Sequence, residues 1–97
     1  MKSFSVKEWF ANKIANEIRM NISSCDLFAI LRETEKAVYA LVDLGRGHSR
    51  TMWIPKSCLV ECEVGDDANG RHHYETLQIA DYNEARARFE AFRADFN

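Results

Sequence analysis

Two cysteines and two histidines lie within fifteen or so positions of one another: Cys58, Cys62, His72 and His73. These residue types together often bind zinc. If residues 58–64 form a β-strand, however, the Cα atoms of Cys58 and Cys62 lie about 13 Å apart at ~3.3 Å per residue. Two thiolates so far apart cannot share one zinc ion, because each Zn–S bond is only ~2.3 Å long. We therefore expect no metal and no cofactor, and we expect the cysteines to be packing residues.

Ser57 and the pair Glu61 and Glu63 are the other side chains suited to catalysis. Ser57 follows Pro-Lys and lacks the glycines of a strained nucleophile elbow. Two carboxylates on one face of a strand are able to act as general acid and base, but the same alternation is typical of a solvated strand face. The sequence thus favours a protein that is not an enzyme.

A basic segment precedes these carboxylates, because no acidic residue occurs from Leu44 to Val60. Cations beside an exposed aromatic ring are how small β-proteins hold single-stranded nucleic acid. The candidate contacts of this kind are Arg46, His48, Arg50, Trp53 and Lys56. Against this stands the net charge of −2, since such binders usually carry a basic excess. Nucleic acid is therefore the alternative partner.

An acidic segment follows, with a single basic residue, Arg71, between Glu61 and Glu84. Complementary charge steers one protein toward another, so this segment predicts a protein partner with a basic surface. The candidate contacts on this acidic face are Glu61, Glu63, Asp66 and Asp67.

The elements that must position these residues begin with an N-terminal helix. Ser5 and Glu8 have the spacing of a capping box, and Phe4 and Trp9 have that of a hydrophobic staple. An apolar stripe then recurs every three or four residues, through Val6, Trp9, Phe10, Ile14 and Ile18. We expect this helix to end near residue 20 and to bury its aromatic rings against a sheet.

Apolar and β-branched runs then predict strands, and short polar links join them as consecutive antiparallel neighbours. The runs are residues 27–33, 36–44, 51–54, 58–64 and 72–80. Asp81 has the position of an N-cap for a last helix, whose apolar stripe reaches Phe96. The expected fold is α+β: an antiparallel four- to five-stranded sheet or small partly closed barrel, flanked by N-terminal and C-terminal amphipathic helices.

Length and composition set the outer limits. The 97 residues predict one domain spanning positions 1–97, and 46% apolar with 29% charged residues is typical of a soluble globular chain. No apolar run approaches the ~20 residues that cross a bilayer, and the N-terminus lacks a secretory signal. We expect a cytoplasmic protein without membrane contact. An open sheet edge also allows two copies to pair as a homodimer.

Residues 30–61, from ILRETEKAVYALV to RTMWIPKSCLVE, resemble a pattern in small proteins of phages and other mobile elements. In that pattern an Arg-Glu-Thr-Glu-Lys-Ala hairpin and a short glycine-bearing insert precede Trp-Ile/Leu-Pro-Lys-Ser. Where the pattern has Gln after Pro-Lys-Ser, this chain has Cys58. The resemblance implies a fold element and a mobile-element origin.

In size and setting the chain is also similar to anti-CRISPR inhibitors, which bind a host effector complex and block DNA access or a conformational step. The function expected from sequence is therefore a non-catalytic protein-interaction module. The finer hypothesis is an inhibitor of a host defence nuclease complex. A small nucleic-acid-binding protein that uses the basic loop and Trp53 is the alternative.

Overall fold

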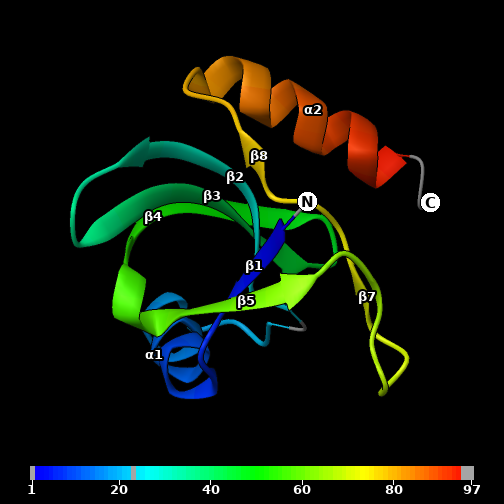
Figure 1. The fold of residues 1–97 in the computed structure, drawn as a ribbon. Helices are drawn as coiled ribbons and strands as arrows, with labels where there is room; N and C mark the ends of the chain where they lie inside the picture. Colours follow the sequence, from blue (N-terminus) through cyan, green and yellow to red (C-terminus); the bar gives the residue numbers. More distant parts are fainter. Residues whose placement is uncertain (1, 23, 95–97) are drawn as a thin grey trace.

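Eleven elements make up the computed structural model, which describes residues 2–22 and 24–94. In chain order they are β1 (Lys2–Val6), α1 (Glu8–Ile18), β2 (Asp26–Glu33), β3 (Ala37–Gly45), β4 (His48–Pro55), the 3-10 turn η1 (Lys56–Cys58), β5 (Leu59–Glu63), β6 (Gly65–Asp66), β7 (His72–His73), β8 (Leu77–Gln78) and α2 (Tyr82–Ala94). The fold is α+β, as the sequence predicts. A mostly antiparallel sheet lies between α1 and α2 (Figure 1).

The main sheet has the strand order β4-β3-β2-β1-β5, and β8 pairs with β2 in parallel. The pairing of β2 with β3 shifts register after Leu27 and again after Ile30. Such irregularities bend a strand and increase its twist. On its other side β2 pairs with β1 at Asp26 and with β8 at Ala29 and Ile30. The sheet therefore curls without closing into a barrel, and β4 and β5 remain its two edges.

Two hydrophobic cores form because β3 is apolar on both faces, as expected for a central strand covered on both sides. One face of β3 packs with α1 in the first core, which includes Val6, Ile14, Leu27, Ile30, Val38, Val42 and Ile54. The other face packs with α2 in the second core, which includes Phe28, Leu31, Leu41, Ala85 and Phe89. Each buried Leu, Ile or Phe contributes about 1.5–3 kcal/mol relative to exposure.

A two-residue turn joins β3 to β4. Arg46 and Gly47 both have positive φ, 54° and 79°, which the tight hairpin turns that match strand twist require. The side chain of Asp43 closes the turn, because its Oδ1 accepts a hydrogen bond of 2.8 Å from the backbone N–H of Gly45. The glycines of this segment therefore form a specified turn.

The predicted start of the N-terminal helix is wrong. Residues 2–6 form the strand β1, which pairs with β5 from Lys2↔Glu63 to Val6↔Leu59. Ser5 does not cap a helix, since its hydroxyl donates instead to the carbonyl of Cys25 at 3.2 Å. The helix begins at Glu8, with Lys7 as an N-cap that makes no side-chain hydrogen bond. Trp9 is 59% exposed rather than packed on the sheet.

The C-terminal helix follows its prediction more closely. Asp81 Oδ1 accepts hydrogen bonds from the backbone N–H groups of Asn83 and Glu84, so it is the N-cap. Phe89 is buried in the second core and Phe92 packs at its margin. Phe96, which also belongs to the predicted stripe, lies outside the described residues.

The predicted strand over residues 72–80 is a further correction. Only the two short segments β7 and β8 are strands. β8 runs parallel to β2. Thr76, which lies between β7 and β8 in the chain, donates a hydrogen bond of 2.8 Å from its hydroxyl to the carbonyl of Leu27. The chain here passes from the β6–β7 hairpin, along β2, to the start of α2.

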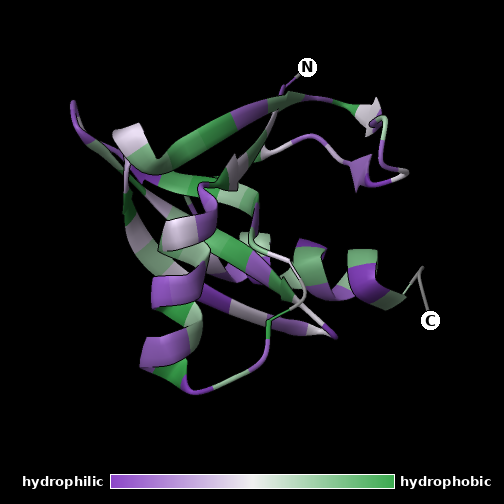
Figure 2. Cartoon of the chain, turned by 90° about the horizontal axis from the view of Figure 1, so that it is seen from below, coloured by the Kyte–Doolittle hydropathy of each residue, from purple (hydrophilic) through white to green (hydrophobic). Residues whose placement is uncertain are grey.

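Hydropathy varies within each helix, as Figure 2 shows in the alternating hydrophobic and hydrophilic segments of α1 and α2. Within residues 2–22 and 24–94, no helix has the length and apolar character needed to cross a membrane.

Candidate functional site

The basic residues predicted to contact nucleic acid do not form one surface. Arg46 lies in the β3–β4 turn and Lys56 in η1. The strand β4 separates them, and its eight residues span about 23 Å at ~3.3 Å per step. Lys56 also forms an ion pair with Glu33, with Nζ 2.7 Å from Oε2.

Arg50 and Trp53, which were also predicted to contact nucleic acid, lie on opposite faces of β4. Arg50 pairs with Val42, whose side chain belongs to the first core, on the α1 side. Trp53 pairs with Tyr39 on the α2 side, where their ring centroids are 5.2 Å apart. Trp53 is 49% exposed, so its ring is accessible. The neighbouring cation Arg50 nevertheless points to the opposite face of the sheet.

The predicted acidic face divides into two parts, of which the first is the β6–β7 hairpin. Asp66 Oδ1 lies 3.0 Å from His72 Nδ1. Asp67 Oδ2 lies 3.0 Å from His73 Nε2, and its Oδ1 accepts from the backbone N–H groups of Asn69 and Arg71. The hydrogen bond with His73 lowers the pKa of Asp67 most, and the bonds from the two backbone N–H groups lower it further. Asp67 therefore closes a turn, and sequence reasoning missed its histidine partner.

The second part lies on β5, where Glu61 and Glu63 alternate on the same face as Leu59. On the neighbouring strand β1, Phe4 is the cross-strand partner of Glu61 and Lys2 is that of Glu63. Lys2 Nζ lies 3.3 Å from Glu61 Oε2, yet the Glu61 side chain remains 53% exposed. Both glutamates are thus presented at the edge of the concave side of the sheet.

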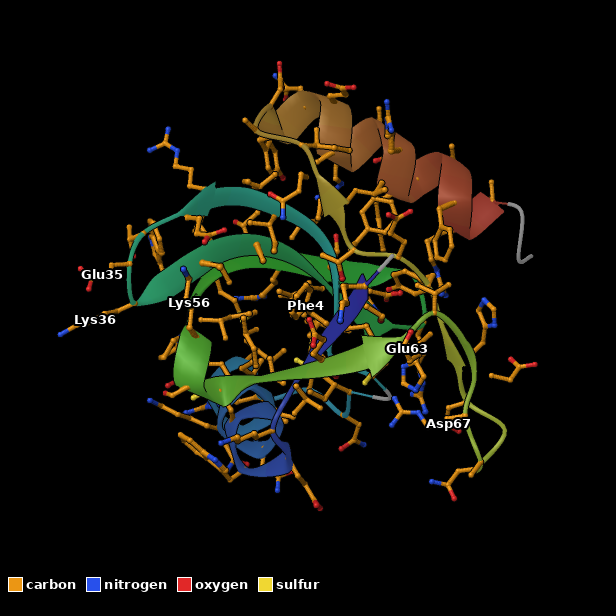
Figure 3. All side chains as sticks on the ribbon, viewed as in Figure 1. Phe4, Glu35, Lys36, Lys56, Glu63 and Asp67 are labelled. Carbon is orange, nitrogen blue, oxygen red and sulfur yellow. The ribbon has the colours of Figure 1, made fainter. Side chains whose placement is uncertain are left out.

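A groove of about 360 Å³ opens at this place, between β1 and β5 on one side and the β2–β3 hairpin on the other. We call it the mouth groove. Its floor is apolar and its rim is charged or polar: the floor consists of Phe4, Ile30, Val38 and Leu59, and the rim of Glu33, Lys56, Glu61 and Gln78. Figure 3 shows Phe4 between β5 and the hairpin, with Lys56 beside the same opening and Glu63 at the far end of β5.

Two of the predicted contact residues meet in this groove. Lys56 comes from the basic segment and Glu61 from the acidic one, and both line it. Each carboxylate of the lining has a basic partner: Glu33 pairs with Lys56, and Glu61 pairs with Lys2, which lies outside the lining. Glu63 adds a further carboxylate next along β5. The rim therefore carries exposed charges of both signs around an apolar floor, with the carboxylate of Glu63 beyond its end.

Sequence reasoning missed half of the groove. Phe4 was expected in a helical staple, and no local signal indicates that residues 2–6 pair with residues 59–63. The groove lies on the concave side of a curled sheet, a typical place for binding sites in small barrels. Its volume falls at the lower end of the ~300–1,000 Å³ range of ligand pockets, which suits one or two side chains.

The cysteines have no shared site. Cys25 and Cys58 are buried, and Cys62 is partly exposed on β5. Burial, followed by the charges of Asp26 and Asp43, raises the pKa of Cys25 to about 12. Among the described residues, no group of three or more His, Cys, Asp and Glu side chains is arranged to hold a metal ion.

These features define a small α+β domain with a curled sheet and an apolar groove with a charged rim. Comparison with known proteins adds no relative, because no family model matches the chain and no curated protein or solved structure matches it significantly. The function must therefore be inferred from the groove and its charges.

Proposed function

We propose that the chain is a non-catalytic protein-interaction module that holds an apolar side chain of a basic protein segment in the mouth groove. The observation that carries this proposal is the combination of an apolar floor with the exposed carboxylate of Glu61 at its edge and that of Glu63 further along β5. An apolar anchor buried in such a groove contributes about 1.5–3 kcal/mol. Basic residues beside the anchor would meet the carboxylates, which favours association and orients the partner.

The finer hypothesis is that this partner belongs to a host defence nuclease complex. It is supported by the resemblance of residues 30–61 to small mobile-element proteins. The groove itself supports only the chemistry of the partner, a basic segment with an apolar anchor.

Affinity purification with charge-reversed variants tests the proposal. The tagged chain is incubated with host extract, with and without nuclease treatment, as wild type and as Glu61→Lys/Glu63→Lys. The matched control is Glu84→Lys/Glu90→Lys on α2, because these glutamates are similarly exposed and also have basic neighbours. A third variant, Gln78→Trp, fills the groove without changing its charge.

We expect the same protein to be recovered with wild type and control, independently of nuclease. Recovery falls about tenfold with either groove variant, since a few central contacts carry most of the affinity. Equal recovery with all four chains, each confirmed to be folded by its thermal melt, would remove the groove from the interface.

The nucleic-acid alternative makes a different prediction. It requires the wild type to shift single-stranded DNA or RNA at low salt and Arg46→Glu/Arg50→Glu to lose that shift. The separation of Arg50 and Trp53 onto opposite faces of β4 favours the protein partner.

A further inference from the structure

One edge of the main sheet is open along β4. This strand stands at the end of the order β4-β3-β2-β1-β5, so among the described residues only β3 pairs with it. The pairing with β3 runs without a shift from Ala37↔Pro55 to Asp43↔Ser49. An edge of this kind presents a row of unpaired N–H and C=O groups to which a further strand can bind.

The hydrogen bonds to β3 fix which backbone groups of β4 point outward. Lys56 N–H donates to the carbonyl of Lys36 at 2.8 Å, which makes these two residues a hydrogen-bonded pair in the register of β3 with β4. Because such pairs alternate with non-hydrogen-bonded ones, every second residue of β4 bonds to β3. The intervening residues, which direct their N–H and C=O groups to the open side, are Ser49, Thr51 and Trp53.

The side chains of β4 differ between its two faces. His48 and Arg50 are exposed on the α1 side, and neither forms an ion pair with a carboxylate within residues 2–22 and 24–94. Trp53 is exposed on the other side, beside the ring of Tyr39. Since an added strand alternates its side chains in the same way, it would meet basic groups on one face and an aromatic ring on the other.

We propose that the β4 edge binds an extended acidic segment of a partner protein, which joins the sheet as an antiparallel strand. Two acidic residues of the segment lie opposite His48 and Arg50, and an apolar residue lies opposite Trp53. Read from its N-terminus, the segment has the pattern apolar-x-x-acidic-x-acidic. In strand addition of this kind, main-chain hydrogen bonds provide affinity and the alternate side chains provide specificity. Cross-strand pairs of opposite charge add to both.

Charge distinguishes this occupant from a second copy of the chain. Antiparallel pairing of two β4 strands about Thr51 would use all the outward N–H groups, but it would place the two Arg50 side chains diagonally across from each other, where like charges repel. The other edge of the sheet, β5, carries Glu61 and Glu63 and would repel an acidic strand. Among the described residues, β4 contributes none to the lining of the mouth groove, so this proposal does not depend on the function proposed for that groove.

A synthetic peptide tests the proposal with the wild-type chain. The probe is fluorescein-labelled Ser-Leu-Thr-Val-Glu-Thr-Glu-Ser, in which Leu is placed opposite Trp53 and the two Glu opposite Arg50 and His48. Its binding is measured by fluorescence anisotropy at low ionic strength, where exposed charges are least screened. We expect saturable binding, and binding at least about tenfold weaker when both Glu are replaced by Lys.

Backbone methylation of the peptide tests strand addition itself. N-methylation of Val removes the N–H that bonds to Thr51 and should weaken binding at least about tenfold. N-methylation of the preceding Thr, whose N–H points away from β4, is the matched control and should leave binding within about twofold of the parent peptide. Amide hydrogen exchange should slow at Thr51 and Trp53 on binding, because these N–H groups are free only in the unbound chain.

Charge reversal on the protein gives an independent check. Arg50→Glu should weaken binding of the acidic peptide about tenfold and bind the Lys peptide more tightly than the wild type does. Lys13→Glu, at an exposed position of α1, changes the net charge equally and should leave both affinities unchanged. Circular dichroism and thermal melts confirm that both variants are folded.

The peptides decide the question with the wild type alone, even if a variant fails to fold. Equal affinity for the Glu and Lys peptides, an equal effect of the two methylations, or no saturable binding would each overturn the proposal. Displacement of the bound peptide by oligo(dT) that also binds more tightly would assign the edge to single-stranded nucleic acid. Concentration-dependent self-association that excludes the peptide would assign it to a second copy.

Discussion

Burial sets the reactivity of individual side chains in this protein. Cys25 is 5% exposed and lies next to Asp26 in the chain, which itself faces Asp43 across the sheet. Thiolate is the reactive form of cysteine, and the pKa of Cys25 is raised to about 12 by burial first and then by the two carboxylates. Position in the fold therefore distinguishes this cysteine from Cys62.

We predict that alkylation of the native protein reflects this difference. Iodoacetamide near neutral pH should modify Cys62, whereas Cys25 and Cys58 react only after unfolding, because they are buried. Mass spectrometry of the digested protein at successive times measures the rates, with Cys62→Ser as the control. Modification of native Cys25 as fast as that of Cys62 would contradict the prediction.

A second prediction at this scale concerns Asp67 and pH. The hydrogen bond with His73, and then that with Arg71 N–H, lower the pKa of Asp67. A lowered folded-state pKa stabilises the folded form above the unfolded value, ~3.9 for Asp, and this contribution is lost as pH falls through the folded-state pKa. The β6–β7 hairpin should therefore be closed at neutral pH and loosen below about pH 4.

Amide hydrogen exchange of Asn69 and Arg71, compared with that of β3, measures this opening. Asp67→Asn keeps the size of the side chain and should remove the added acid sensitivity of the hairpin. A variant whose hairpin still loosens over the same acidic range would show that another group is responsible.

At the scale of elements, local signals predicted those parts of the fold whose partners are near in sequence. The β2–β3 hairpin, its continuation into β4 and the Asp81 cap all depend on contacts between residues fewer than twenty positions apart. The strand β1 was missed because its partner, β5, lies more than fifty positions away, and Ser5 with Glu8 has the local appearance of a cap. The hydrogen bond between Tyr74 and Asp43 was missed for the same reason, since the two residues are 31 positions apart.

The two helix starts give a matched prediction. Asp81→Ala removes the two hydrogen bonds that cap α2 and should lower the free energy of unfolding by about 1 kcal/mol. Lys7→Ser adds a capping hydroxyl to α1, whose N-cap makes no side-chain bond, and should raise it by up to about 1 kcal/mol. Urea denaturation measures both changes, and a stabilising Asp81→Ala or a destabilising Lys7→Ser would contradict the assignment of these caps.

For the whole molecule, curling of the sheet creates the groove on which the proposed function depends. The bends in β2 bring the β2–β3 hairpin over β1 and β5, so that an apolar floor is left open beside Glu61. The α2 face is occupied by the second core. The mouth groove is thus the opening that we propose holds a protein segment.

Hydrogen exchange of the chain in complex with its captured partner tests the proposed interface most directly. Binding in the mouth groove predicts slowed exchange at residues 56–63 and at the β2–β3 hairpin, with α2 and the β3–β4 turn unchanged. Protection confined to α2 or to the β3–β4 turn, with residues 56–63 exchanging as in the free chain, would contradict the assignment of the mouth groove as the binding site.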